Sequence, residues 1–131
     1  MRLFGSSQLP ATVATLMPPD LTYSFDDEVA SKFCYDLDGK RLEIHFTGCW
    51  DIATGRYHDG PCHLLIHHWT DAHCQEPNVN PRFVRLEERM GIVSLLLHYG
   101  WTAEGLEVWV NTIDDRYLLL RFANPSLEVI L

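Results

Sequence analysis

Histidines and cysteines crowd one short stretch of the chain. The stretch CHLLIHHWTDAHC runs from Cys62 to Cys74 and holds four of the seven histidines and two of the four cysteines. Zinc prefers imidazole and thiolate ligands, but it needs three or four of them converging with tetrahedral geometry. The apolar alternation predicts a strand from Cys62 to Trp69, in which residues two apart share a face. His63 and His67 then lie about 13 Å apart by the rise of a strand, so one ion cannot bind both directly.

A zinc site could form only if the segment after this strand folds back. His68, His73 and Cys74 would then converge, with Cys62 as a further ligand. The simpler interpretation is an ordinary strand, with Cys62, Leu64 and Ile66 in the core and with His63 and His67 facing solvent or a partner. We favour the strand and expect no metal and no other cofactor, and we keep a metal-binding domain as an alternative.

Catalytic patterns are weak in this sequence. Nucleophilic catalysis needs a serine or cysteine beside a base and an orienting group, and nothing like a nucleophile elbow surrounds the cysteines. The best acidic candidates lie in Asp38-Gly39 and Asp114-Asp115. Turns favour aspartate there because its side chain hydrogen-bonds to nearby backbone groups. We therefore expect a protein that is not an enzyme.

Length and charge point to one acidic globular domain. The chain has 131 residues, of which 47% are hydrophobic, and its net charge is -8 from 18 acidic and 10 basic residues. Such a charge disfavours binding to nucleic acid or to an anionic membrane, and it speeds encounter with a basic partner. We expect an N-terminal arm over residues 1–20, without a signal-peptide core, followed by a single domain over 21–131. No two cysteines form a C-x-x-C pair, which favours free thiols in a reducing, cytoplasmic setting.

The elements that would position these residues are mostly short strands. Asp38-Gly39 predicts a tight turn in KFCYDLDGKRLEIHF, where apolar residues alternate with polar ones after the turn. We expect a long loop or two short extended pieces over residues 50–61, a loop over 71–81 and one short helix within 82–90. Further strands are expected in GIVSLLLHYG, LEVWVNT, YLLLRF and LEVIL. The predicted fold is mainly β: an antiparallel sheet or small sandwich of about seven short strands, with at most one short helix.

One face of the segment LEVWVNT resembles a binding surface. Its apolar residues Leu106, Val108 and Val110 are expected to face the core, which leaves Trp109 outside beside acidic and amide groups. An outward aromatic residue in such company is typical of an interface anchor, although Trp109 would be core if both faces were covered. The residues we expect to contact a partner are Glu43, Glu107, Trp109, Asp114 and Asp115.

Three segments together resemble a known class of protein. They are DLDGKRLEIHFTG, GRYHDGPCHLLIHHWTDA and LEVWVNTIDDRYLLLRFANPSLEVI. Their pattern is similar to that of small cytoplasmic immunity proteins of bacterial polymorphic-toxin and contact-inhibition loci. The resemblance implies a non-enzymatic protein that binds and neutralises a cognate toxin domain, and such proteins are often acidic against basic nuclease toxins. It supplies no set of functional residues for this chain. A further alternative is a homo-oligomeric accessory protein. Two copies of the chain would then pair as a homodimer through an open sheet edge formed by LEVIL.

Overall fold

Ten strands and one short helix make up the described part of the chain. The structure is a computed structural model, and it describes residues 21–131, so the predicted arm over 1–20 lies outside the described residues. The elements are β1 (Tyr23–Ser24), β2 (Glu28–Asp36), β3 (Arg41–Asp51), β4 (Arg56–His67), β5 (Asp71–Glu76), β6 (Asn80–Arg85), α2 (Leu86–Arg89), β7 (Val93–Thr102), β8 (Gly105–Thr112), β9 (Tyr117–Ala123) and β10 (Ser126–Ile130). The mainly antiparallel β fold is confirmed, with ten strands rather than about seven.

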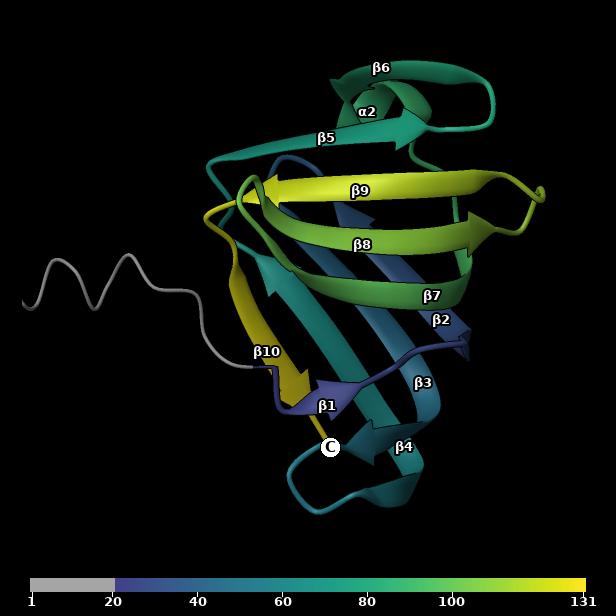
Figure 1. The fold of residues 1–131 in the computed structure, drawn as a ribbon, viewed down its shortest axis with the longest axis vertical. Coiled ribbons are helices and arrows are strands. Elements are labelled where there is room, and N and C mark those ends of the chain that lie inside the picture. Colours follow the sequence, from purple (N-terminus) through teal and green to yellow (C-terminus); the bar gives the residue numbers. More distant parts are fainter. Residues whose placement is uncertain (1–20) are drawn as a thin grey trace, which may run out of the picture.

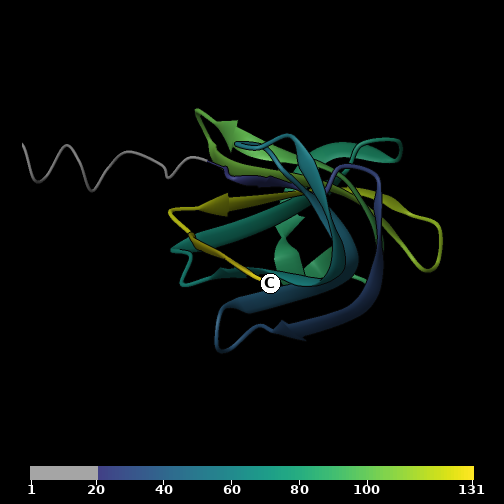
Figure 2. The same cartoon turned by 90° about the horizontal axis from the view of Figure 1, so that it is seen from below.

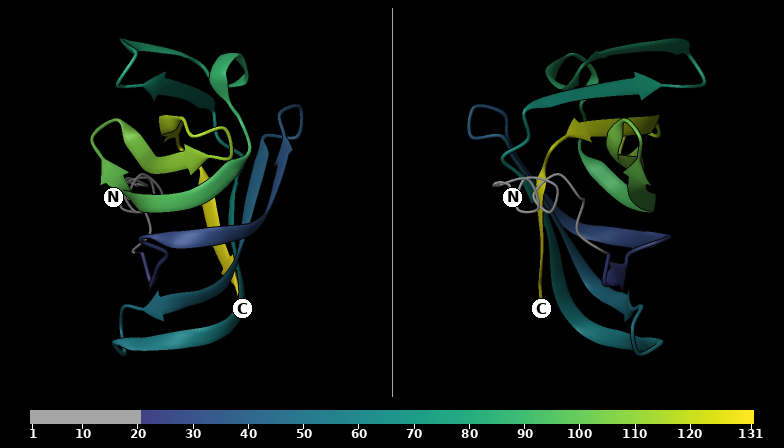
Figure 3. Two further views of the ribbon diagram at one scale, coloured as in Figure 1. Left: turned by 90° about the vertical axis from the view of Figure 1, so that its right-hand side faces the viewer. Right: turned by 60° about the vertical axis from the view of Figure 1, so that its left-hand side comes forward.

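The strands form one open antiparallel sheet that folds over on itself. Its order is β10-β4-β3-β2-β7-β8-β9-β5-β6, with β1 paired to β3. In Figure 1, β7, β8 and β9 run across the front of β2, β3 and β4. We call the two halves the β3 layer (β10, β4, β3, β2 and β1) and the β8 layer (β7, β8, β9, β5 and β6). Figure 2 shows the curvature from below, and Figure 3 shows the two layers from the side.

Strand β2 is the corner that joins the two layers. Its first residues pair with β7, through Glu28 with Leu96 and Val29 with Leu95. The rest of β2 pairs with β3, and the register shifts between Ala30 and Lys32. A bulge of this kind bends a strand and increases its twist, which lets one strand serve both layers.

The core lies between the layers and is built by simple alternation. In β4, β8, β9 and the first half of β3, even-numbered positions point inward, so the odd-numbered positions of these strands mostly face away from the core. The fully buried residues that meet there are Leu42, Ile44, Phe46, Cys62, Leu64 and Ile66 from the β3 layer and Leu106, Val108, Val110, Leu118, Leu120 and Phe122 from the β8 layer. The predicted inward face of LEVWVNT is therefore confirmed.

The predicted β2–β3 hairpin is also confirmed, with a small difference in its turn. The amide of Lys40 donates to the carbonyl of Leu37, and the amide of Gly39 donates to Asp36 Oδ1 at 3.1 Å. The left-handed residue of the turn is Lys40, at φ 50°, and not the glycine. Asp36 thus stabilises the turn through its side chain.

The segment 71–81, predicted as a loop, lies in a hairpin of two strands, and the segment 50–61 forms two extended pieces joined by a turn over 52–55. Residues 71–85 form the β5–β6 hairpin, which packs on the edge of β9. Strand β4 begins at Arg56 and runs through Gly60 and Pro61. These two residues lie opposite Thr47 alone, because Phe46 pairs with Cys62 while Gly48 pairs with Asp59. Proline cannot donate to a sheet ladder, and this bulge is a position where the missing donor is tolerated.

The predicted short helix is present as the single turn α2. Within residues 21–131, no helix has the length and apolar character needed to cross a membrane.

Candidate functional site

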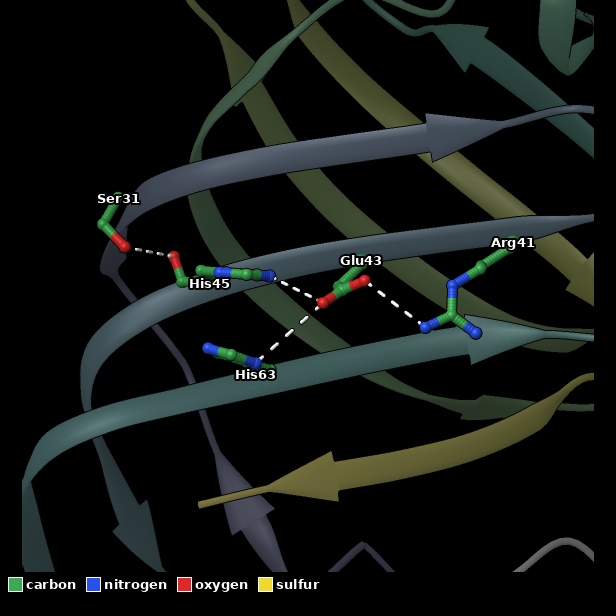
Figure 4. Close-up of polar contacts among 5 residues, drawn as sticks. All are labelled: Ser31, Arg41, Glu43, His45 and His63. Carbon is green, nitrogen blue, oxygen red and sulfur yellow. Dashed lines mark hydrogen bonds and ion pairs between the residues drawn. The ribbon is translucent and has the colours of Figure 1, made fainter.

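Two histidines and a glutamate converge on the outer face of the β3 layer. His45 Nε2 lies 2.7 Å from Glu43 Oε2, and His63 Nδ1 lies 3.9 Å from the same oxygen. The two imidazole rings stack, with centroids 3.6 Å apart and an interplanar angle of 14°. Figure 4 shows the Glu43 carboxylate between these rings and the guanidinium of Arg41. We call these three residues, Glu43, His45 and His63, the Glu–His–His cluster.

The strand ladder brings the cluster together. Glu43 and His45 are two residues apart on β3, so they share its outer face. His63 is the direct cross-strand partner of His45 on β4. Side chains of directly paired residues lie within contact distance, which accounts for the stacked rings.

The Glu43 carboxylate is shared between neighbours of different kinds. One oxygen faces the two histidines, while the other lies 3.5 Å from an Arg41 guanidinium nitrogen. The hydrogen bond to His45 lowers the pKa of Glu43, and the charges of His45, Arg41 and His63 act in the same direction against the opposing effect of burial. The carboxylate therefore stays ionised and is held in one orientation.

An open depression lies beside the cluster, at the bulge between β3 and β4. Its volume is about 440 Å³, and its lining comprises Ser31, His45, Phe46, Thr47, Asp59, Gly60, Pro61 and His63. The histidine side chains are 18% exposed at His45 and 32% exposed at His63. The cluster is thus half-buried but open to solvent on the side of the depression.

The chemistry available to the cluster is ligation and proton exchange. Imidazole nitrogens and a carboxylate oxygen are the donors that zinc and neighbouring transition metals accept, and their ligand atoms here all lie within 4.8 Å of one another. Within residues 21–131 this is the one group of three or more such side chains that converges in this way.

The metal ligands considered from the sequence do not converge. Cys62 and Cys74 are fully buried free thiols, and the Cys74 thiol lies 3.9 Å from the carbonyl oxygen of Leu86. The ring of His68 packs against that of His67, and His73 lies 3.8 Å from a carboxylate oxygen of Asp71. His63, placed by the sequence on a solvent or partner face, is the one member of that stretch that joins the cluster.

Four of the five predicted partner-binding residues lie in or beside β8. Glu107 is nearly buried and accepts two hydrogen bonds from Arg121, at 3.0 and 2.8 Å. Trp109 is half-buried and stacks on Tyr117 with centroids 5.6 Å apart. Both occupy the outer face of the β8 layer.

The remaining predicted partner-binding residues are divided between the layers. Asp114 and Asp115 occupy the β8–β9 turn, where Asp114 accepts hydrogen bonds from Thr112 and Arg116. Glu43 belongs to the β3 layer, whose outer face points the opposite way. The structure therefore does not bring Glu43 together with the other four.

An exposed aromatic pair, not predicted from the sequence, lies at the end of the β3–β4 hairpin. Trp50 and Tyr57 are direct cross-strand partners, 47% and 41% exposed, with their rings edge to face at 5.2 Å. The Tyr57 hydroxyl donates to Glu28 Oε1 at 3.2 Å. A side chain at Gly48 would occupy the space of the Tyr57 ring, so the glycine is what lets this ring lie across β3. The available signal is a tryptophan at the start of the segment 50–61, which is expected to form a long loop or two short extended pieces.

Comparisons with protein-family models, with curated proteins and with solved structures give no significant match. Functional inference therefore depends on the residues and geometry described above.

Proposed function

We propose that this protein is a non-catalytic binding protein of the immunity type, which holds and neutralises a basic protein partner. The observation that carries the proposal is the exposed Trp50–Tyr57 pair on a chain whose net charge is -8. Tryptophan and tyrosine are the residues that most often dominate binding energy at interfaces.

The aromatic pair is held in place before any partner arrives. The Tyr57 ring is fixed by its hydroxyl bond to Glu28 and by its contact with Trp50. A side chain that is already ordered loses little conformational entropy on binding, so more of its contact energy appears as affinity.

Carboxylates near the aromatic pair suit a partner rich in lysine and arginine. Glu28 contacts Tyr57 directly, and Asp59 is exposed on β4, two residues beyond Tyr57. Cations bind both to carboxylates and to the faces of tryptophan and tyrosine rings. This is why we place the principal contact at Trp50 and Tyr57 and treat the face around Trp109 as the competing location.

The first experiment is a two-hybrid screen of this protein against a genomic-fragment library from its source organism. We expect a basic partner whose expression arrests growth, and we expect co-expression of this protein to restore growth. Because the library does not depend on natural expression levels, recovery of no specific partner would contradict the proposal.

The second experiment locates the contact. With the purified partner, Trp50→Ala should weaken binding at least about tenfold, whereas Trp109→Ala should change it less than about twofold. Binding should also weaken as salt is raised, because charge attraction between the partners is screened. Loss of affinity in Trp109→Ala alone would move the contact to the β8 layer, where the sequence placed it.

A further inference from the structure

The Glu–His–His cluster has the donor set of a metal centre with an open coordination position. We propose that Glu43, His45 and His63 bind one zinc ion on the outer face of the β3 layer. The site goes beyond the proposed function and does not depend on it, since none of its residues belongs to the Trp50–Tyr57 pair.

The ligand atoms are already close to the spacing that zinc needs. Zinc bonds of about 2.0–2.1 Å in a tetrahedral arrangement place neighbouring ligand atoms about 3.3 Å apart. Here the separations from Glu43 Oε2 are 2.7 Å to His45 Nε2 and 3.9 Å to His63 Nδ1. Small side-chain rotations are enough to bring these atoms to the zinc spacing. The two stacked rings tilt apart, and the backbone of the paired strands stays in place.

The ladder limits how far the ligands can separate. His45 and His63 are held opposite each other by the pairing of β3 with β4, and Glu43 is held two residues along the same strand. In the zinc-bound form His45 carries its proton on Nδ1, because Nε2 is the ligand. A site mounted on paired strands is preorganised, which lowers the cost of assembling it around an ion.

Arg41 acts as a positioning residue for this site. Its guanidinium lies 3.5 Å from Glu43 Oε1 and leaves Oε2 directed at both histidines (Figure 4). Such outer contacts fix the orientation of a ligating carboxylate. The depression beside the histidines gives a fourth ligand, water or a small anion, access to the ion.

The direct test is a zinc titration of the full chain after metal removal, read by competition with a chromogenic chelator. We expect one zinc per chain with micromolar or tighter affinity. His45→Ala, His63→Ala and Glu43→Gln should each weaken binding at least about tenfold. Circular dichroism checks that each variant keeps its β spectrum.

Two other histidines provide matched controls. His98 on β7 also faces a carboxylate, with Nδ1 3.3 Å from Asp26, but it has no second histidine beside it among the contacts of the described residues. His73 belongs to the alternative set of ligands considered from the sequence. His98→Ala and His73→Ala should leave zinc affinity unchanged within about twofold.

Cobalt provides an independent spectroscopic readout. A cobalt ion bound by two imidazoles and a carboxylate gives visible d–d bands without a thiolate-to-cobalt charge-transfer band. Stoichiometric zinc, lost in His63→Ala and retained in His73→Ala, with no thiolate band, would support the site. No stoichiometric binding, binding insensitive to His63→Ala, or a thiolate band would each overturn it. Zinc affinity that survives Trp50→Ala would separate this site from the partner contact.

Discussion

Glu43 makes three polar side-chain contacts on the outer face of the β3 layer. Its carboxylate accepts a charged contact from Arg41 and a hydrogen bond from His45, with His63 slightly farther away. The hydrogen bond to His45 is the main cause of its lowered pKa. A lowered pKa in the folded state means that folding is favoured by the ionised form.

The pH dependence of stability should reveal this contribution. The ordinary pKa of the glutamate is 4.5, and the folded value lies below it. The stabilisation is therefore fully present above about pH 4.5 and is lost as the pH falls through the folded pKa. Glu43→Gln should lower the free energy of unfolding by about 0.5–1 kcal/mol at pH 7. Urea denaturation at pH 7 and in the acidic range should show the difference from the parent shrinking on acidification.

A matched change tests whether the effect belongs to the cluster. Glu104 is an exposed residue of the β7–β8 turn, and Glu104→Gln removes the same charge. It should leave stability nearly unchanged at both pH values. An equal loss in the two variants would point to net charge rather than to the His45 contact.

At the scale of elements, the β7–β8 turn depends on a glycine. Gly105 has φ 127°, and a Cβ there would collide with the backbone carbonyl of Phe122 on β9. Gly105→Ala should lower the free energy of unfolding by about 2–4 kcal/mol. Alanine is strained at this φ, and the backbone of β9 cannot move away from the added Cβ at low energetic cost. Urea denaturation measures the loss.

The variant Gly55→Ala serves as a control that distinguishes the cost of a positive φ from the cost of the collision with β9. Gly55 also has a left-handed φ, of 70°, but nothing lies within 4 Å of the position of its missing Cβ. Gly55→Ala should cost only about 1 kcal/mol, for the conformation alone. Equal losses at Gly105 and Gly55 would show that the close approach of β9 contributes nothing.

Elements with clear alternation could be predicted from the sequence, and those that depend on distant partners could not. The β2–β3 hairpin and the inward face of β8 follow from a turn dipeptide and a period of two. Strands β5 and β6 carry polar residues, Pro77 directly follows β5 and Pro81 is the second residue of β6, so their local signal is that of a loop. They form a hairpin because β9 offers them a paired edge.

The candidate site could not be predicted because it depends on the pairing register of β3 with β4. The alternation after the Asp38-Gly39 turn predicts that Glu43 and His45 share an outer face. The metal site suggested by the sequence is a separate one around His73. Regular pairing outward from the Asp51–Arg56 end of the hairpin would set Cys62 opposite His45, but the bulge shifts the ladder so that His63 takes this place. Since one residue of register decides which side chains meet, the cluster could not be inferred without locating the bulge.

At the scale of the whole molecule, one core spans both layers. Cys62 from β4 and Cys74 from β5 belong to the same buried cluster, although among residues 21–131 strand pairing joins the layers only at the start of β2. Burial raises the pKa of Cys62 to about 12 and that of Cys74 to about 11, so neither thiol reacts readily in the folded protein.

Thiol labelling in urea should therefore follow a single transition. We expect a maleimide reagent to label Cys34, which is partly exposed, in the folded protein. Cys62 and Cys74 should become reactive together, with the same urea midpoint, because loss of either layer exposes the shared core. Mass spectrometry of the labelled peptides measures both. Labelling of Cys74 at a clearly lower urea concentration would show that the β8 layer unfolds on its own.

The bulge at Gly60 and Pro61 also has a consequence for how such a surface could arise. Deleting one of these two residues would restore regular pairing while keeping His45 opposite His63, so the extra residue is not needed for the cluster. It does shape the depression, because Thr47, Gly60 and Pro61 of the bulge belong to its lining. In evolutionary terms, a one-codon insertion or deletion at this bulge would remodel the wall of the depression while leaving the pairing of His45 with His63 intact.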